Sequence, residues 1–396
     1  MGGFPPYAMS CVGWGTRLAA SRFIAVRFSA ALTLSLSQPD MEPVTHFLTG
    51  ACLGRSGFNR KTAYATLAMT LAAEAPDIDV FLGFRGPVAG FEHHRGITHT
   101  LIGAPLMALA VTGIVWLIHR WRKKPPAIAP RWGLIWLFAL IADFSHILLD
   151  FTNNYGIRPF FPFNPHWYAW SIIFIFDPLI FLALLSSLVM PWLFGLADQE
   201  IGARRQPFRG RAWSIGALVF IVLWWSLRNA EHAHAINLVR NAGVVSEPIV
   251  KIDAEPAMVD PFAWHVLAET HDFYQMVEVH TRHDQIDDRS PDGSDVIYKP
   301  EVTPAVAAAK QSWLGRVYLD WAKFPVATDT GNDPVPYDNA PLPEPGWHTV
   351  QFQDLRFANA ALGLGGPRRN TPLGAWVYAG PKNEIEGMFM SGKEQK

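Results

Sequence analysis

Long apolar runs alternate with short polar stretches over about the first 230 residues of the chain. Residues 101–118 carry no charge, and further apolar runs occupy 133–151, 171–196 and 213–227. About 20 apolar residues in a helix cross the ~30 Å hydrocarbon core of a bilayer. Each run could instead be a buried helix of a soluble protein, but four in succession favour membrane insertion. The pattern predicts a mainly α, polytopic transmembrane bundle, with a weaker, acid-interrupted segment at 62–82.

Two shorter helices are expected before the first clear span. Apolar periodicity predicts one helix at about 44–55 and another at about 62–76, joined by the polar sequence RSGFNRK. A helical hairpin of this length returns the chain to its starting level. It would therefore bring His46 back beside Asp77 and Asp79.

After residue 229 the apolar runs stop. Short segments at 275–280, 316–319, 348–351 and 375–378 alternate with turns rich in Pro, Gly and Asp. Such spacing is typical of strands joined by turns. The sequence therefore predicts a membrane-embedded helical domain over 41–228 and a small, mostly β domain over 229–396.

The first forty residues fit poorly with the rest. Arg17, Arg22 and Arg27 interrupt a Ser/Ala/Leu stretch, and no clean small-residue cleavage site follows it. A signal peptide needs an unbroken apolar core of about 7–15 residues. We expect residues 1–40 to be a poorly ordered extension, or an incorrectly assigned start with Met41 as the natural first residue.

Basic residues predict the orientation. They concentrate in the loops at 120–131 and 204–211, which the positive-inside rule assigns to the cytoplasm. Residues 83–96, residues 152–170 and everything after Leu227 are then extracytoplasmic. Trp167, Tyr168 and Trp170 would form an interfacial aromatic belt on that side.

Composition removes several classes of function. Half of the residues are hydrophobic, 17% are charged, and the formal net charge of −1 provides no field for nucleic acid. Cys11 and Cys52 are too few for a disulfide framework or a zinc knuckle, so any metal ligands must be His and carboxylate. No GxSxG elbow, Walker loop or GxGxxG fingerprint occurs, which argues against serine-hydrolase, NTPase and dinucleotide chemistry.

Polar clusters border or interrupt the apolar segments at four places. They are Thr45-His46, PDID at 76–79, HHRGITH at 93–99 and DFSHILLD at 143–150. Asp143, His146 and Asp150 share one helix face at i, i+3 and i+7. Ionisable groups at membrane depth are costly unless paired or solvated, so their retention indicates a site. A buried hydrogen-bond network or a proton path is the alternative.

The predicted topology lets all four clusters meet near the outer interface. Imidazole and carboxylate bind Zn²⁺, Mn²⁺ or Fe²⁺, and this many carboxylates would accommodate two ions sharing a bridging Asp. A bound ion lowers the pKa of its water to about 7, so hydrolysis is the natural chemistry. Arg95 would suit an anionic group such as phosphate, or would anchor a lipid headgroup.

Other polar residues have simpler interpretations. Asp177 would either orient a ligand histidine or cap the helix that Pro178 begins, and we favour the cap. His232 and His234 are expected at the interface. Four histidines of the β-rich region are expected to be solvated surface residues: His265, His271, His280 and His283.

The ordered motifs resemble a known family. MEPVTH at 41–46, PDID at 76–79, HRGITH at 94–99 and HILLD at 146–150 are similar to the YdjM-like inner-membrane metal-dependent hydrolases. NNYG at 153–156 and FDP at 176–178 also fit, and the resemblance runs from about residue 41 to 200. It implies a bacterial inner-membrane hydrolase whose metal-site residues are His46, Asp77, Asp79, His94, His99, His146 and Asp150.

A more distant likeness to zinc-dependent phospholipase C and single-strand nucleases lies in the His-x-x-x-Asp pair and the early Thr-His, and it favours phosphoester hydrolysis. The resulting hypothesis is a hydrolase of a lipid or lipid-linked substrate, with membrane lipids as its partners and Asp143 supporting the ligands. Glu74, Asp79 and His93 remain open as the general acid. The alternatives are a metal transporter or metal-homeostasis protein, and a membrane scaffold with a structural metal.

Overall fold

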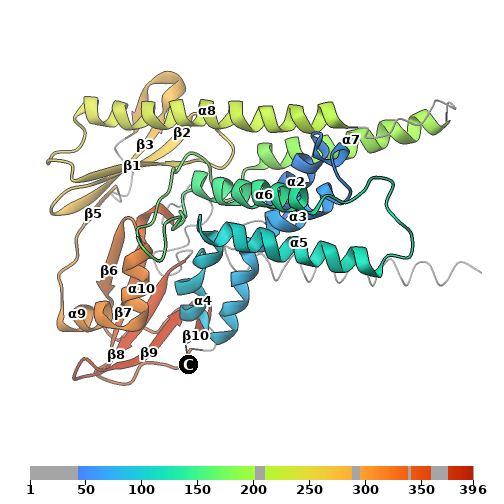
Figure 1. Cartoon of the computed structure of the whole chain (residues 1–396). Helices are drawn as coiled ribbons and strands as arrows, with labels where there is room; N and C mark the ends of the chain where they lie inside the picture. Colours follow the sequence, from blue (N-terminus) through green and yellow to red (C-terminus); the bar gives the residue numbers. More distant parts are fainter. Residues whose placement is uncertain (1–42, 201–209, 288–294, 338–339, 358–372, 396) are drawn as a thin grey trace, which may run out of the picture. The chain divides into compact units, whose positions relative to one another are not determined.

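The computed structural model describes residues 43–200, 210–287, 295–337, 340–357 and 373–395 (Figure 1). The predictions made for residues 1–40 lie outside this part of the chain. The described residues from 43 onward form one compact unit.

Four helices of the described chain are long and apolar enough to cross a membrane. They are α5 (Gly103–Trp121), α6 (Trp132–Thr152), α7 (Pro178–Glu200) and α8 (Arg211–Ala242). Half of the apolar window of α6 is buried, against less than a third in the other three. Thus α6 is the central helix, whereas the others expose apolar faces of the kind that contact lipid.

The four predicted apolar segments are confirmed as helices, with two differences at their ends. Residues 171–177 are not helical, because Asp177 caps α7 and Pro178 is its first residue. Helix α8 continues to Ala242, well beyond the predicted domain boundary at 228. Its last turns pack against the C-terminal sheet, where Ala235 and Val239 share a core with Trp264.

The predicted hairpin is formed by α2 (Pro43–Arg55) and α3 (Ala65–Glu74), with a short 3₁₀ turn, η1 (Phe58–Arg60), between them. The two helices approach closely at Gly50. A Cβ atom there would lie 2.5 Å from the Met69 carbonyl oxygen, so only glycine fits. The next segments are η2 (Ala75–Arg85), α4 (Pro87–His93) and η3 (Ile97–His99).

Beyond α6, residues 153–177 are irregular and return across the end of the bundle. Isolated bridges join Asn153 to Ile173 and Ile157 to Tyr168. Tyr155 belongs to the same apolar core as the helices and strands of the C-terminal region. This segment therefore links the helical part of the molecule to the β-rich part.

The C-terminal region contains two antiparallel sheets (Figure 1). The first has the order β1-β2-β3-β4, with β5 also paired to β3: β1 (Lys251–Pro256), β2 (Ala263–Glu269), β3 (Phe273–His280), β4 (Gln285–Asp287) and β5 (Val296–Tyr298). The second has the order β10-β9-β8-β7-β6: β6 (Pro325–Asp329), β7 (His348–Asp354), β8 (Ala375–Ala379), β9 (Ile385–Met390) and β10 (Lys393–Glu394).

Two helices pack on the second sheet, α9 (Pro304–Gln311) and α10 (Trp313–Trp321). The prediction of a strand at 316–319 is therefore wrong. Ser312 caps α10 by accepting a hydrogen bond from the Gly315 amide, and Leu314, Tyr318 and Trp321 are buried along one face. These three positions have helical spacing, which a four-residue window does not reveal.

Candidate metal centre

Helix α6 contributes His146 and Asp150, one turn apart and both fully buried. The His146 Nδ1 atom lies 2.7 Å from the Ala73 carbonyl oxygen. A carbonyl can only accept, so Nδ1 carries the proton and donates it. The Nε2 atom of His146 is then unprotonated. Its lone pair is free to bind a metal next to the Asp150 carboxylate.

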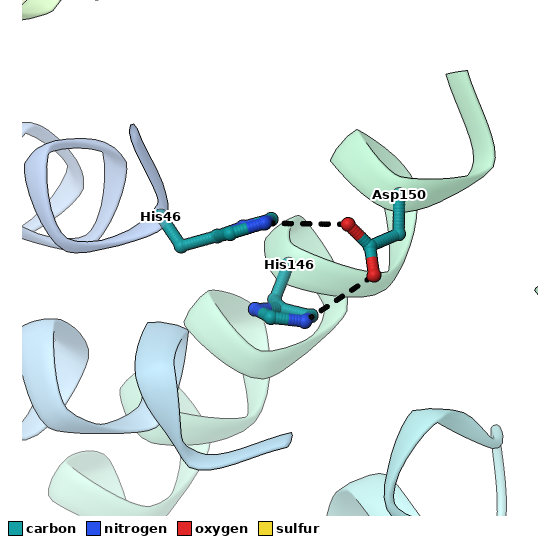
Figure 2. Close-up of side chains that lie close together, drawn as sticks. All are labelled: His46, His146 and Asp150. Carbon is teal, nitrogen blue, oxygen red and sulfur yellow. Dashed lines mark ion pairs between the residues drawn. The ribbon is translucent and has the colours of Figure 1, made fainter. Parts of the chain in front are cut away.

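His46 comes from α2, and its ring lies next to that of His146, with both rings facing the Asp150 carboxylate (Figure 2). Its Nε2 atom lies 3.2 Å from Asp150 Oδ1, and its ring stacks on that of His146 with centroids 3.9 Å apart. The tight α2–α3 hairpin fixes His46 at this depth, because Gly50 lies one turn further along the same helix.

His99 of η3 and Asp77 of η2 complete the cluster. His99 Nε2 lies 3.0 Å from His146 Nε2 and 3.4 Å from both Asp77 Oδ1 and Asp150 Oδ2. Asp77 Oδ1 is 3.5 Å from His146 Nε2. Five donors from four segments therefore converge, although those segments span more than one hundred residues of sequence.

The donor atoms form two groups that share His146. One contains His46, His146 and Asp150, the other Asp77, His99 and His146, and within each group the atoms lie within 4.8 Å of one another. Ligands about 2.0–2.1 Å from a tetrahedral Zn²⁺ are about 3.3–3.4 Å apart. The spacing of these nitrogen and oxygen atoms fits a small divalent cation.

Asp79 lies beside these groups and belongs to neither. Its Oδ2 atom accepts from the Arg95 amide at 2.8 Å and from Thr98 Oγ1 at 3.2 Å, and lies 3.2 Å from His99 Nδ1. Its Oδ1 atom is 3.3 Å from His94 Nδ1. Asp79 is thus placed to orient the His99 ring, with His94 on its outer side. Asp79 and His94, which were predicted as ligands, therefore lie outside both donor groups.

Arg95 is fully buried, so it makes no contact with lipid headgroups in this arrangement. Its Nε atom lies 3.0 Å from Asp150 Oδ2, and its Nη1 atom donates to the Gly156 carbonyl at 2.6 Å and to Asn153 Oδ1 at 3.3 Å. The guanidinium also stacks over the Tyr155 ring. Arg95 balances the Asp150 charge and fixes that carboxylate in place.

Asp143 is fully buried one turn before His146. Neither of its carboxylate oxygens has a hydrogen-bond partner in the described part of the chain. Of the residues left open as the general acid, His93 is half exposed and 4.0 Å from Glu92, whereas Glu74 ends α3 with one carboxylate oxygen buried.

The remaining candidate residues lie away from the centre. Asp177 Oδ1 accepts from the amides of Leu179 and Ile180, which confirms the helix cap, and Oδ2 accepts from Trp224 of α8. His232 and His234 of α8 pair with Asp253 and Asp284 of the C-terminal region.

The histidines of the C-terminal sheets are not all surface residues. His271 is exposed, as predicted, but the side chain of His265 is only 14% exposed. Burial lowers the pKa of His265 to about 4, and nearby His280 adds to this effect. Because alternate residues of β2 point toward opposite faces of the sheet, His265 lies on the face opposite Trp264 and Val266, which belong to the core shared with α8.

Sequence reasoning did not assign a role to Thr98 or to the Asn153–Gly156 segment, which hold Asp79 and Arg95. The Asn-Asn-Tyr-Gly sequence directly after the ligand helix was a visible signal for such a role. The sequence could not show that this segment binds Arg95, because the two are about sixty residues apart along the chain.

These features define a class: a multi-helix membrane protein with a buried His/Asp centre at one end of its bundle. Residues 41–235 match the model of the family described as YdjM inner membrane protein, which confirms the resemblance noted from the motifs. The described inner-membrane location agrees with the four apolar helices.

A Bacillus subtilis (strain 168) protein named uncharacterized protein YfhP is 30% identical in an alignment of 163 positions that covers 39% of this chain. The chain spans about half the length of that curated relative, 47%. No solved structure matches the chain.

Proposed function

We propose that this protein is a membrane-embedded, metal-dependent hydrolase that cleaves a phosphoester or ester of a lipid or lipid-linked substrate. The observation that carries the proposal is the convergence of His46, Asp77, His99, His146 and Asp150 with two imidazole Nε2 atoms only 3.0 Å apart. Two lone pairs so close repel each other, and a cation between them removes the repulsion.

The residues have separate roles in this proposal. The five converging side chains hold one or two ions of zinc, manganese or iron. Asp79 keeps the His99 ring in the tautomer that presents Nε2, and Arg95 limits the negative charge at Asp150. When bound, the cation supplies a Lewis acid and lowers the pKa of water to about 7. Asp143, buried on α6 one turn before His146, is the proposed support for the ligands of that helix.

The first test is elemental analysis of detergent-purified protein. The wild type is compared with a His146→Ala/Asp150→Ala variant and with a matched control, His234→Ala/Asp284→Ala, which removes a His/Asp pair 2.7 Å apart elsewhere. We expect stoichiometric metal in the wild type and the control, and none in the first variant. Absence of metal from the wild type would refute the proposal.

A metal-binding transporter or metal-homeostasis protein is the second candidate, because His146 and Asp150 lie on α6, one of the four candidate spans. Metal flux into proteoliposomes together with no turnover of phosphoester or ester substrates would favour it. Release of product at a rate that disappears with His146→Ala would favour the hydrolase.

We also propose that the centre and the C-terminal region lie on the extracytoplasmic side. The basic loop at 120–131 supports this orientation. Alkaline phosphatase fused after Glu394 should be active, and the same enzyme fused after Lys124 should be inactive. The reverse pattern would invert the proposed topology.

A further inference from the structure

The five converging side chains differ sharply in their access to the surface. The side chains of His99, His146 and Asp150 are 0% exposed and that of His46 is 2% exposed, whereas Asp77 is 20% exposed. Asp77 is therefore the member of the centre nearest the surface, although both of its carboxylate oxygens are themselves buried.

The residues around Asp77 are exposed and apolar. Along η2, Ile78 is 55% exposed, Phe81 60% and Phe84 87%, and the rings of Phe81 and Phe84 stack with centroids 5.9 Å apart. Asp77 and Asp79 face inward from the same turn, so the segment separates a polar inner side from an apolar outer side.

This apolar surface continues onto the membrane-spanning part of the molecule. Ile97 of η3 and Leu101 and Ile102 just before α5 are 51%, 43% and 51% exposed, and they lead to Leu106 and Leu109 on the outer face of α5. The segment η2 contacts both η3 and α5, and α4, which follows η2, is drawn below the start of α5 in Figure 1. The exposed apolar face of α5 therefore borders the segment that carries Asp77.

We propose that Ile78, Phe81 and Phe84, called here the η2 apolar rim, insert into the lipid layer, and that the substrate reaches the centre sideways from the bilayer. The substrate class is a bilayer phospholipid or similar amphiphile. Its acyl chains lie along Phe81 and Phe84, and its ester or phosphoester group lies at the Asp77 end of η2, where the side chains covering the centre are thinnest. The substrate part of this inference rests on the proposed function, whereas the insertion part does not.

Insertion is measured without any need for activity. A nitrobenzoxadiazole label is placed at Phe84→Cys in a background lacking Cys11 and Cys52, and the protein is embedded in phosphatidylethanolamine/phosphatidylglycerol nanodiscs. The control label is at Asp272→Cys, whose side chain is 65% exposed in the turn between β2 and β3. Doxyl-labelled lipid should quench the label at 84 strongly and the label at 272 weakly. Equal, weak quenching at both positions would overturn the inference.

Delivery from the lipid is measured with a Phe81→Ser/Phe84→Ser variant. We expect its turnover of phosphatidylglycerol in nanodiscs to fall roughly tenfold, with turnover of soluble bis(p-nitrophenyl) phosphate and metal content unchanged. The control, Val259→Ser/Leu342→Ser, changes two exposed apolar residues of the C-terminal region.

Equal losses of turnover on the lipid and on the soluble substrate would overturn lateral delivery. A wild type that binds metal but hydrolyses neither substrate would remove the hydrolase function, while the quenching result would still decide insertion.

Discussion

At the scale of single residues, the centre depends on groups that hold ligands as much as on the ligands. Asp79 illustrates this, because its two oxygens reach His94, His99, the Arg95 amide and Thr98. Replacing such an orienting carboxylate weakens metal affinity by about 10–100-fold in comparable sites.

We predict that Asp79→Asn lowers metal affinity by roughly this factor without abolishing binding, because the amide loses the charge that orients His99. His94→Gln should retain stoichiometric metal, since His94 lies outside both donor groups. Competition with a fluorescent chelator measures both variants. Complete loss of metal from His94→Gln would show that His94 is itself a ligand.

A second residue-scale feature lies in the C-terminal region, where β1 places Asp253 and Glu255 on one face, both buried. Burial and the neighbouring Asp253 raise the pKa of Glu255 to about 8. For Asp253, burial opposes ionisation, but His232 and Lys323 outweigh it and hold the pKa at about 2. The two carboxyls therefore differ in protonation at neutral pH.

Glu255 should make the protein less stable as pH rises. A raised acid pKa means that the folded state binds the proton more tightly, so stability falls between about pH 4.5 and pH 8. We predict that Glu255→Gln raises the melting temperature at pH 8.5 by several degrees and changes it little at pH 5. Thermal unfolding in detergent at both pH values tests this. An equal shift at both pH values would contradict it.

At the scale of elements, the α2–α3 hairpin sets the position of His46. Gly50 is the point of closest approach, whereas Gly113 of α5 has open space where a Cβ atom would lie. We predict that Gly50→Ala destabilises the protein by about 1–3 kcal/mol and releases metal. Gly113→Ala, its matched control, should be neutral or slightly stabilising because alanine favours helix. Equal behaviour of the two variants would exclude this role for the hairpin.

The elements also reveal how far sequence reasoning extends. The apolar runs, the hairpin and the His/Asp face of α6 were predictable because each follows from local periodicity. The helix α10 was missed, because its buried residues repeat over nine positions and the window considered was four. The separate positions of Asp79 and Asp77 also could not be predicted, since which carboxylate faces His146 depends on how η2 packs against η3.

At the scale of the whole molecule, the C-terminal region holds the segment that supports the centre. Arg356 donates to the Asn154 carbonyl at 2.6 Å, and Trp321 donates to the Tyr155 carbonyl at 3.2 Å. Asn153 and Gly156, which flank Asn154 and Tyr155 in the chain, accept hydrogen bonds from Arg95. A continuous chain of contacts thus runs from the C-terminal region through Arg95 to Asp150.

This connection gives the C-terminal region a measurable effect on metal binding. Arg356 is buried and paired with Asp354, and lysine would keep its charge but lose the forked contacts to Asp354 and Asn154. We predict that Arg356→Lys lowers metal affinity about tenfold although Arg356 is no ligand, while Arg282→Lys, an exposed arginine over Phe262, leaves it unchanged. Calorimetric titration of metal into the apoproteins decides the matter. If Arg356→Lys binds metal as tightly as the wild type, the 153–156 segment holds Arg95 by itself, and the C-terminal region must act in some step after metal binding.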